Sequence, residues 1–218
     1  AAHAHPNQFA LLRQRRFAPF FWTQFLGAGN DNLLKFAFTV MVTYQLQLTD
    51  PFLQPQLAGL TIGALFILPF LLFSATSGQL ADKYDKARVM RLIKSFEILI
   101  MVLAIVGFVG QLTWLLLACL FLMGVHSTLF GPVKYAYLPQ HLDAHEITGG
   151  NGMVEMGTFV AILLGQLAGG LLVVVPGMGP ELAGGACLAI AVVLTLTSGW
   201  EFARDVVRHR RGEAAVQH

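Results

Sequence analysis

Charged side chains are scarce in this chain, and their scarcity excludes most soluble folds. Lys, Arg, Asp and Glu together make up 12% of the 218 residues, while hydrophobic residues make up 56%. Soluble domains carry about 25% charged residues on average, roughly twice this share. Cysteine is also rare, and Cys119 and Cys187 both fall within apolar runs. We therefore expect buried free thiols rather than a disulfide framework.

Six apolar runs account for most of the chain, and each is long enough to cross a bilayer as an α-helix. A membrane helix needs about 20 apolar residues, so this length suits about six spans. The strict alternation of a membrane β-barrel is absent, and helices satisfy their own backbone groups in lipid. The expected spans are Phe17–Leu46, Leu57–Leu80, Val89–Val109, Leu112–Tyr137, Gly149–Val175 and Ala183–Ala203.

The predicted fold class is therefore all-α, a polytopic membrane protein with six transmembrane helices in one bundle. The bundle is expected over residues 17–203, with an amino-terminal segment over 1–16 and a basic tail over 204–218. Two Gly-x-x-x-Gly spacings, Gly59/Gly63 and Gly165/Gly169, predict close approach between helices.

Basic residues gather at one side of the predicted bundle. They precede the first span, surround the connection between the second and third, and follow the sixth. The set comprises Arg13, Arg15, Arg16, Lys83, Lys86, Arg88, Arg91, Lys94, Arg204, Arg208, Arg210 and Arg211. By the positive-inside rule, we expect this side and both termini to be cytoplasmic. The loop 140–148 belongs there by parity, yet it contains two His and two acidic residues.

An acidic residue flanked by two amides lies deep in the first span. Asp31, between Asn30 and Asn32, sits about fourteen residues into its helix, which at about 1.5 Å per residue is near the middle of the bilayer. One interpretation is a carboxylate that faces a polar cavity and binds a cation or a substrate ammonium group. The alternative is an internal ion pair with Lys35, one helical turn further on.

A second group of polar residues is expected where the fourth and fifth spans meet. Lys134 follows Gly131-Pro132, and Glu155 follows Asn151 by one turn. The two spans are antiparallel neighbours joined at the basic side, so a contact between Lys134 and Glu155 is expected. It is either a structural ion pair or part of a site for an anionic group such as phosphate.

The remaining polar residues give weaker signals. Glu97 lies one turn after Lys94 and is interpreted as a snorkelling or paired surface residue. His141 and His145 have metal-ligand spacing but no third ligand nearby, so no metal site is expected. His126-Ser127 lacks a nucleophile elbow, and the sixth span has no His for an intramembrane protease. We expect no enzyme, no cofactor and no nucleic-acid partner.

The charged loop 78–88 reads GQLADKYDKAR and lies between the second and third spans. It resembles the signature loop of the major facilitator superfamily in sequence, in position and in its predicted cytoplasmic side. The family's second glycine is Asp85 here. The resemblance implies that Gly78, Asp82, Lys86 and Arg88 belong to a cytoplasmic gate, which latches the two halves of the transporter together.

Further motifs resemble the lysophospholipid transporter branch of that superfamily. They are QFLGAGNDN over 24–32, GPVKY over 131–135, NGMVE over 151–155 and AILLG over 161–165. The resemblance implies alternating-access transport of lysophosphatidylethanolamine-type lipids to the inner leaflet of a bacterial inner membrane. It also implies that Asp31, Asn30, Asn32, Lys134, Glu155 and Asn151 bind the lipid headgroup.

The chain matches only the amino-terminal six-helix half of such a transporter, whose substrate path lies between two halves. The implied partners, besides the bilayer and the lipid, are a carboxy-terminal half, a second copy, or fused acyltransferase domains. Two alternative functions stay open. One is a proton-coupled drug or metabolite exporter that uses Asp31 or Glu155, and the other is a truncated membrane fragment that does not transport.

Overall fold

Five long α-helices and one short 3₁₀ helix form the part of the chain that the computed structural model describes, which is residues 8–44, 53–174 and 193. The 3₁₀ helix η1 covers Gln8–Arg13. The long helices are α1 (Ala18–Tyr44), α2 (Pro55–Lys83), α3 (Lys86–Val109), α4 (Thr113–His141) and α5 (Ile147–Val174). The predicted sixth span, Ala183–Ala203, and the tail 204–218 lie outside the described residues.

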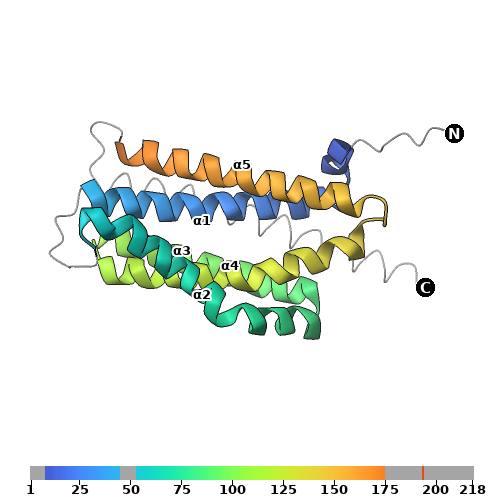
Figure 1. Ribbon diagram of the computed structural model, residues 1–218, viewed down its shortest axis with the longest axis horizontal. Helices are drawn as coiled ribbons and strands as arrows, with labels where there is room; N and C mark the ends of the chain where they lie inside the picture. Colours follow the sequence, from blue (N-terminus) through green and yellow to red (C-terminus); the bar gives the residue numbers. More distant parts are fainter. Residues whose placement is uncertain (1–7, 45–52, 175–192, 194–218) are drawn as a thin grey trace.

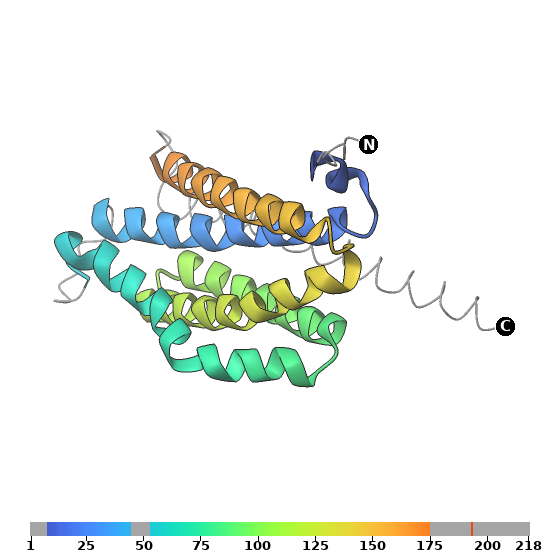
Figure 2. The same cartoon turned by 45° about the vertical axis from the view of Figure 1, so that its right-hand side comes forward.

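The helices pack as two layers around α1 and α4. α5 lies along α1, whereas α2 and α3 both pack on α4 and make little contact with each other (Figures 1 and 2). α4 continues as one helix through Pro132 and Pro139. The all-helical prediction is confirmed for the described residues.

Four helices are long and apolar enough to cross a membrane: α2, α4, most of α3 (Arg88–Val109) and most of α5 (Ile147–Leu171). α1 is of similar length, but its polar run around Asp31 and the nearby Lys35 lower its hydropathy. Six spans were predicted, and the structure supports a membrane bundle with four such helices among the described residues.

Two apolar cores lie along the bundle, one toward each end. The first includes Leu33, Phe38, Ile100, Leu120 and Met123. The second includes Phe17, Phe20, Ile93, Phe130 and Met153. On α1, α3 and α4 the same order holds: residues of one core, then polar residues, then residues of the other core. Polar residues therefore separate the two cores near the middle of the bundle.

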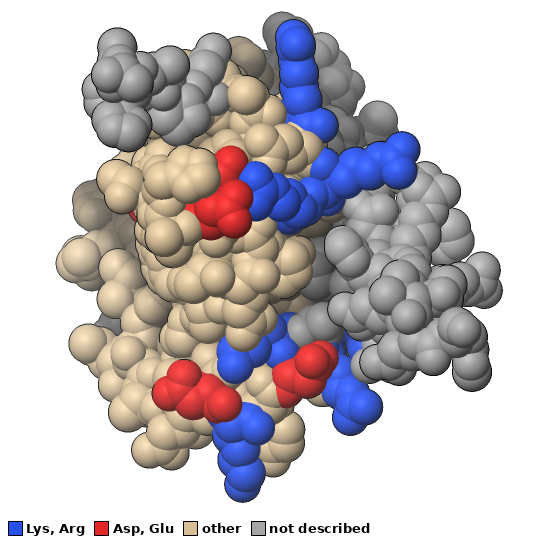
Figure 3. Space-filling model, turned by 90° about the vertical axis from the view of Figure 1, so that its right-hand side faces the viewer, with Lys and Arg blue, Asp and Glu red and all other residues tan. Residues whose placement is uncertain are grey.

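Charged side chains of both signs gather at the end of the bundle that faces the viewer in Figure 3. Arg16 binds the loop between α4 and α5 there. Its guanidinium donates to both carboxylate oxygens of Glu146, at 2.8 and 2.7 Å, and to the carbonyl of His141 at 3.2 Å. Asp143 lies 3.6 Å away. The two acids of this loop thus serve as partners for Arg16, which explains why a loop on the basic side contains them.

Glycines allow α5 to lie directly on α1. A methyl group added at Gly165 would overlap the carbonyl oxygen of Gly29, and one added at Gly169 would lie 2.8 Å from the carbonyl oxygen of Leu33. Close approach at Gly165/Gly169 is therefore confirmed. At Gly63 an added methyl group would meet nothing within 4 Å, and at Gly59 it would meet only the Thr39 side chain, at 3.8 Å, so the predicted close approach at Gly59/Gly63 is not made within the described residues.

This contrast gives a matched test of the α1–α5 contact. Gly165→Ala is expected to lower the free energy of unfolding by about 1–3 kcal/mol, the usual effect of overpacking. Gly63→Ala gains the same helix propensity of about 1 kcal/mol without a clash, so it should stabilise the protein slightly. Thermal unfolding of the two variants in detergent measures the difference. Equal melting temperatures would show that the two helices are not in contact at Gly165.

Candidate functional site

Asp31 points into the bundle and keeps one carboxylate oxygen free of hydrogen bonds. Its side chain is buried, and Oδ2 accepts a hydrogen bond of 2.5 Å from Ser127 Oγ on α4. The buried Oδ1 has no hydrogen-bond partner among the described residues. The alternative pair with Lys35 does not form: the Lys35 ammonium lies 4.5 Å from the ring centroid of Phe66 instead. Asp31 therefore retains acceptor capacity at mid-bundle depth.

The two amides beside Asp31 serve different partners. Asn30 is fully buried, and its Nδ2 donates 2.9 Å to Glu97 Oε1 on α3. Asn32 Nδ2 donates 2.8 Å to the carbonyl of Ala28, one turn back on α1. Asn30 thereby ties α1 to α3, while Asn32 makes a bond within its own helix.

Glu97 is the centre of a buried ionic cluster that sequence reasoning placed at the surface. Its side chain has no exposed area, and Lys94 Nζ donates 2.7 Å to Oε2. His126 Nε2 on α4 lies 3.2 Å from the same oxygen. The prediction of a pair with Lys94 is confirmed, but the surface assignment is wrong. Glu97 lies eleven residues after Lys86, where α3 begins, and therefore about 16 Å into the helix at about 1.5 Å per residue, which is too deep for a carboxylate to snorkel.

Phe130 closes this cluster toward the charged end. The Lys94 ammonium lies 5.3 Å from the ring centroid of Phe130, and the His126 ring stacks on it at 6.2 Å. A cation over an aromatic face is stabilised by the ring quadrupole, most strongly where water is excluded. We call the residues Asn30, Asp31, Lys94, Glu97, His126 and Ser127 the polar layer.

Lys134 and Glu155 meet as expected, in a second cluster between α4 and α5. Lys134 Nζ donates 3.1 Å to Glu155 Oε1, and the hydroxyl of Tyr135 donates to the same oxygen. The lysine is buried, whereas the Glu155 side chain is 42% exposed. Asn151, one turn before Glu155, has a buried Oδ1 without a hydrogen-bond partner among the described residues. No interaction of Lys134 or Glu155 joins this cluster to Asp31 in the described structure.

The residues of the predicted gate lie at the surface of the charged end of the bundle. Asp82 and Arg88 are exposed, Lys86 is half-buried, and within the described ranges none of the three makes an ion pair. A methyl group added at Gly78 would meet nothing within 4 Å. Asp85, the departure from the family pattern, caps α3 by accepting 2.9 Å from the backbone N–H of Arg88. The loop therefore consists of helix ends and a cap, and its charged side chains face outward.

Asp143, His145 and Glu146 gather their ligand atoms within 4.8 Å of one another. The carboxylates of Asp143 and Glu146 already face the Arg16 guanidinium, at 3.6 and 2.7 Å. A cation in this position opposes binding of a metal ion, so we interpret the group as the partner of Arg16.

The polar layer predicts strong coupling between Lys94 and Glu97. Lys94→Met leaves an uncompensated buried carboxylate and is expected to destabilise the protein by about 3–5 kcal/mol. The double variant Lys94→Met/Glu97→Gln removes both charges, keeps an amide oxygen to accept from Asn30, and should recover most of that loss. Melting temperatures of the single and double variants in detergent measure the coupling. Additive effects would show that the pair is not buried as a unit.

Comparison with known proteins agrees with the geometry. Residues 20–216 match the model of the Major Facilitator Superfamily. Relatives named lysophospholipid transporter LplT are 30% identical over 152 residues in Cronobacter sakazakii, and 33% identical over 152 residues in Klebsiella pneumoniae. A third, from Photorhabdus laumondii, is 31% identical over 150 residues.

These alignments cover 68–69% of this chain and 34% of each relative, so the chain aligns with about a third of the length of the relatives it matches. No solved structure matches significantly. The family match nevertheless extends over nearly the whole chain, and it agrees with the long apolar helices and their buried polar layer. The chain therefore belongs to the Major Facilitator Superfamily, a superfamily of membrane transporters.

Proposed function

We propose that this chain forms the amino-terminal half of a lysophospholipid transporter in a bacterial inner membrane. The observation that supports this most is the free, buried Oδ1 of Asp31, which lies within a motif similar to that of the transporter branch. A buried carboxylate without enough partners is expensive in a membrane and is usually retained for a ligand or an ion. The relatives that match about two thirds of the chain are named lysophospholipid transporters.

The two polar clusters match the chemistry of a zwitterionic headgroup. An ethanolamine headgroup carries one ammonium and one phosphate, and these need an anionic acceptor and a cationic donor. Asp31 supplies the acceptor with its free oxygen, and Asn30 and Asn32 border it on the same helix. Lys134 supplies the donor for the phosphate, which would replace Glu155 as the acceptor of its hydrogen bond. Asn151 adds an amide oxygen one turn from Glu155.

A second half would complete the path. α2 and α5 are the least buried of the four membrane-length helices, and both expose large apolar side chains such as Leu60, Leu71, Phe159 and Leu171. These faces are available to a carboxy-terminal half or a second copy, with substrate passing between the halves. Both termini would be cytoplasmic. On that side the partner would contact the gate residues Gly78, Asp82, Lys86 and Arg88. Fused acyltransferase domains would then re-acylate the delivered lipid.

Uptake by spheroplasts that express the whole natural protein tests the role of Asp31. Asp31→Asn keeps the shape and the bond to Ser127 but removes the charge that attracts the ammonium. Uptake of labelled lysophosphatidylethanolamine should fall about tenfold or more, since hydrogen bonds to charged groups contribute about 1.5–3 kcal/mol. Asp143→Asn, the same change at an exposed loop residue, is the control. Uptake by Asp31→Asn equal to that of the control would remove the headgroup role.

Charge reversal distinguishes the two interpretations of the second cluster. If Lys134 binds phosphate, the double variant Lys134→Glu/Glu155→Lys should fold yet transport poorly, because the cation has moved to the other helix. The readouts are the same uptake assay and the melting temperature in detergent. Full uptake by the reversed pair would identify it as a structural ion pair only.

The polar layer also supports a second candidate function, proton-coupled export of a drug or metabolite. His126 of α4 lies against Glu97 of α3, and Asp31 of α1 is bound to the neighbouring Ser127 of α4, so these three titratable groups lie in one buried cluster. A proton-coupled exporter must move protons when substrate is added. Substrate-dependent pH changes in proteoliposomes would favour this function over lipid transport.

A further inference from the structure

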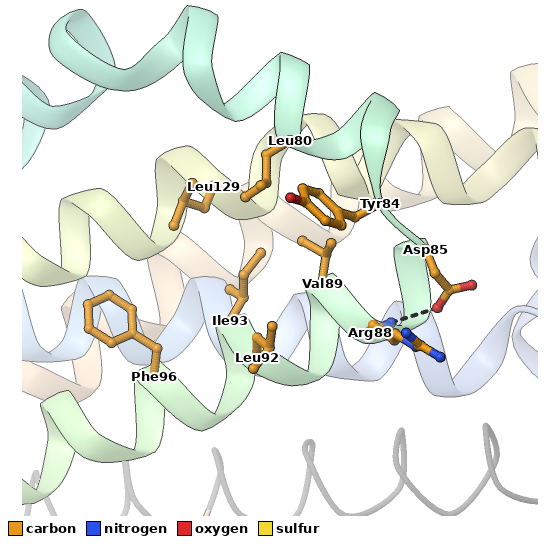
Figure 4. Close-up of a pocket in the computed structure, with 9 residues that line it drawn as sticks. All are labelled: Leu80, Tyr84, Asp85, Arg88, Val89, Leu92, Ile93, Phe96 and Leu129. Carbon is orange, nitrogen blue, oxygen red and sulfur yellow. Dashed lines mark hydrogen bonds between the residues drawn. The ribbon is translucent and has the colours of Figure 1, made fainter.

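A groove opens between α2 and α3 at the charged end of the bundle, on the surface of α4 (Figure 4). Its volume is about 400 Å³. Its walls come from Leu80 and Tyr84 at the end of α2 and from Arg88, Leu92 and Phe96 on α3, with Leu129 of α4 at its floor. The groove exists because α2 and α3 each pack on α4 but hardly on each other.

Almost all of the lining of the groove is apolar. Which molecule occupies the groove therefore depends on the medium around the protein. Leu92 is 71% exposed, so the groove opens outward from the bundle. An ordered water needs two to four polar partners, which the walls do not offer below the mouth. A void of this size would forfeit dispersion contacts along every wall. In a chain that lies in a membrane, the apolar material at hand is an acyl chain of the adjacent leaflet.

The mouth of the groove carries a cation in the right place for a phosphate. Arg88 lies beside Asp85 where α3 begins, and in the described structure its guanidinium has no ion-pair partner. The nearby Asp85 carboxylate accepts a hydrogen bond from the Arg88 backbone instead. Arginine binds phosphate through paired hydrogen bonds. Asp85 and Arg88 both line the groove, and in the sequence 82–91 around them basic residues outnumber acidic ones: Lys83, Lys86, Arg88 and Arg91 against Asp82 and Asp85.

We propose that this groove binds a resident anionic glycerophospholipid of the surrounding leaflet, with one acyl chain between α2 and α3 and its phosphate at Arg88. Basic pockets between membrane helices at the cytoplasmic side favour anionic headgroups in this way. The proposal rests on the membrane setting that the family establishes, and it does not depend on which substrate the transporter moves.

The groove is separate from the proposed headgroup site. Arg88, Leu92 and Phe96 follow at four-residue intervals and share one face of α3. Lys94 and Glu97 lie on another face of α3: Glu97 contacts α1 and α4, and Lys94 lies over the Phe130 ring of α4. The lipid in the groove is therefore not the transported molecule on its way through the polar layer, and it would brace α3 against the end of α2.

Lipid retention by the purified natural protein tests the proposal. The protein is exchanged into mixed micelles of phosphatidylglycerol and phosphatidylethanolamine in equal amounts, and bound lipid is counted by native mass spectrometry. We expect one bound lipid in the groove, enriched in phosphatidylglycerol. Arg88→Ala should weaken its retention by about fivefold, the contribution of one basic side chain near anionic lipid. Arg15→Ala removes the same charge at the same end but outside the groove, and it should retain the lipid.

A second pair of variants tests the acyl chain independently of charge. Leu92→Trp fills the groove and should abolish the retained lipid, whereas Leu99→Trp, an equally large change two turns further along α3, should not. Equal retention by both would overturn the proposal, as would a wild-type protein that retains no lipid. Displacement of the lipid by equimolar lysophosphatidylethanolamine would instead assign the groove to the transport path. Because Arg88 also belongs to the proposed gate, retention is read in detergent, where transport plays no part.

Discussion

The structure depends on one constraint, which is that charged groups in the middle of an apolar bundle must satisfy each other. Glu97 meets this demand by binding Lys94 on its own helix, Asn30 on α1 and His126 on α4. Three helices are thereby held in register at the level where the two apolar cores meet. Breaking such a cluster is expensive because a buried charge without a partner loses its hydration and gains nothing in return. The polar layer thus fixes the geometry in which Asp31 is presented.

Within this layer, the hydrogen-bonding capacity of the Asp31 carboxylate is only half used. Ser127 satisfies one oxygen, and the other is buried with unused acceptor capacity. The cluster around Glu97 and the unpaired oxygen of Asp31 complement each other. A ligand site needs preorganised surroundings and a group that can still accept a hydrogen bond. The Lys134–Glu155 pair has a different character, with one partner half open to the surroundings. An ion pair of this kind can exchange its partner for a ligand with little disturbance to the fold.

Hydrophobic runs predicted the helices well, because span length and backbone satisfaction in lipid leave few alternatives. The contact between Lys134 and Glu155 was also predictable, since two antiparallel neighbours joined by a short loop bring matching depths together. The polar layer was not, because Asn30 and Glu97 are 67 residues apart and their pairing depends on how each helix is rotated. The hydrogen bond from Arg16 to Glu146, 130 residues away, could not be predicted from the sequence for the same reason. Spacing along one helix suggested Lys35 for Asp31, yet Ser127 on another helix took that position.

The central claim is that the free oxygen of Asp31 receives the ammonium of a lipid headgroup, and zero-length coupling tests it most directly. A lipophilic carbodiimide activates a carboxylate, and a primary amine in contact with it then forms an amide. With lysophosphatidylethanolamine present, peptide mass spectrometry should find the lipid attached at Asp31. Lysophosphatidylcholine, whose quaternary ammonium cannot react, should compete and lower the yield. Attachment only at other carboxylates, with Asp31 unmodified, would contradict the account.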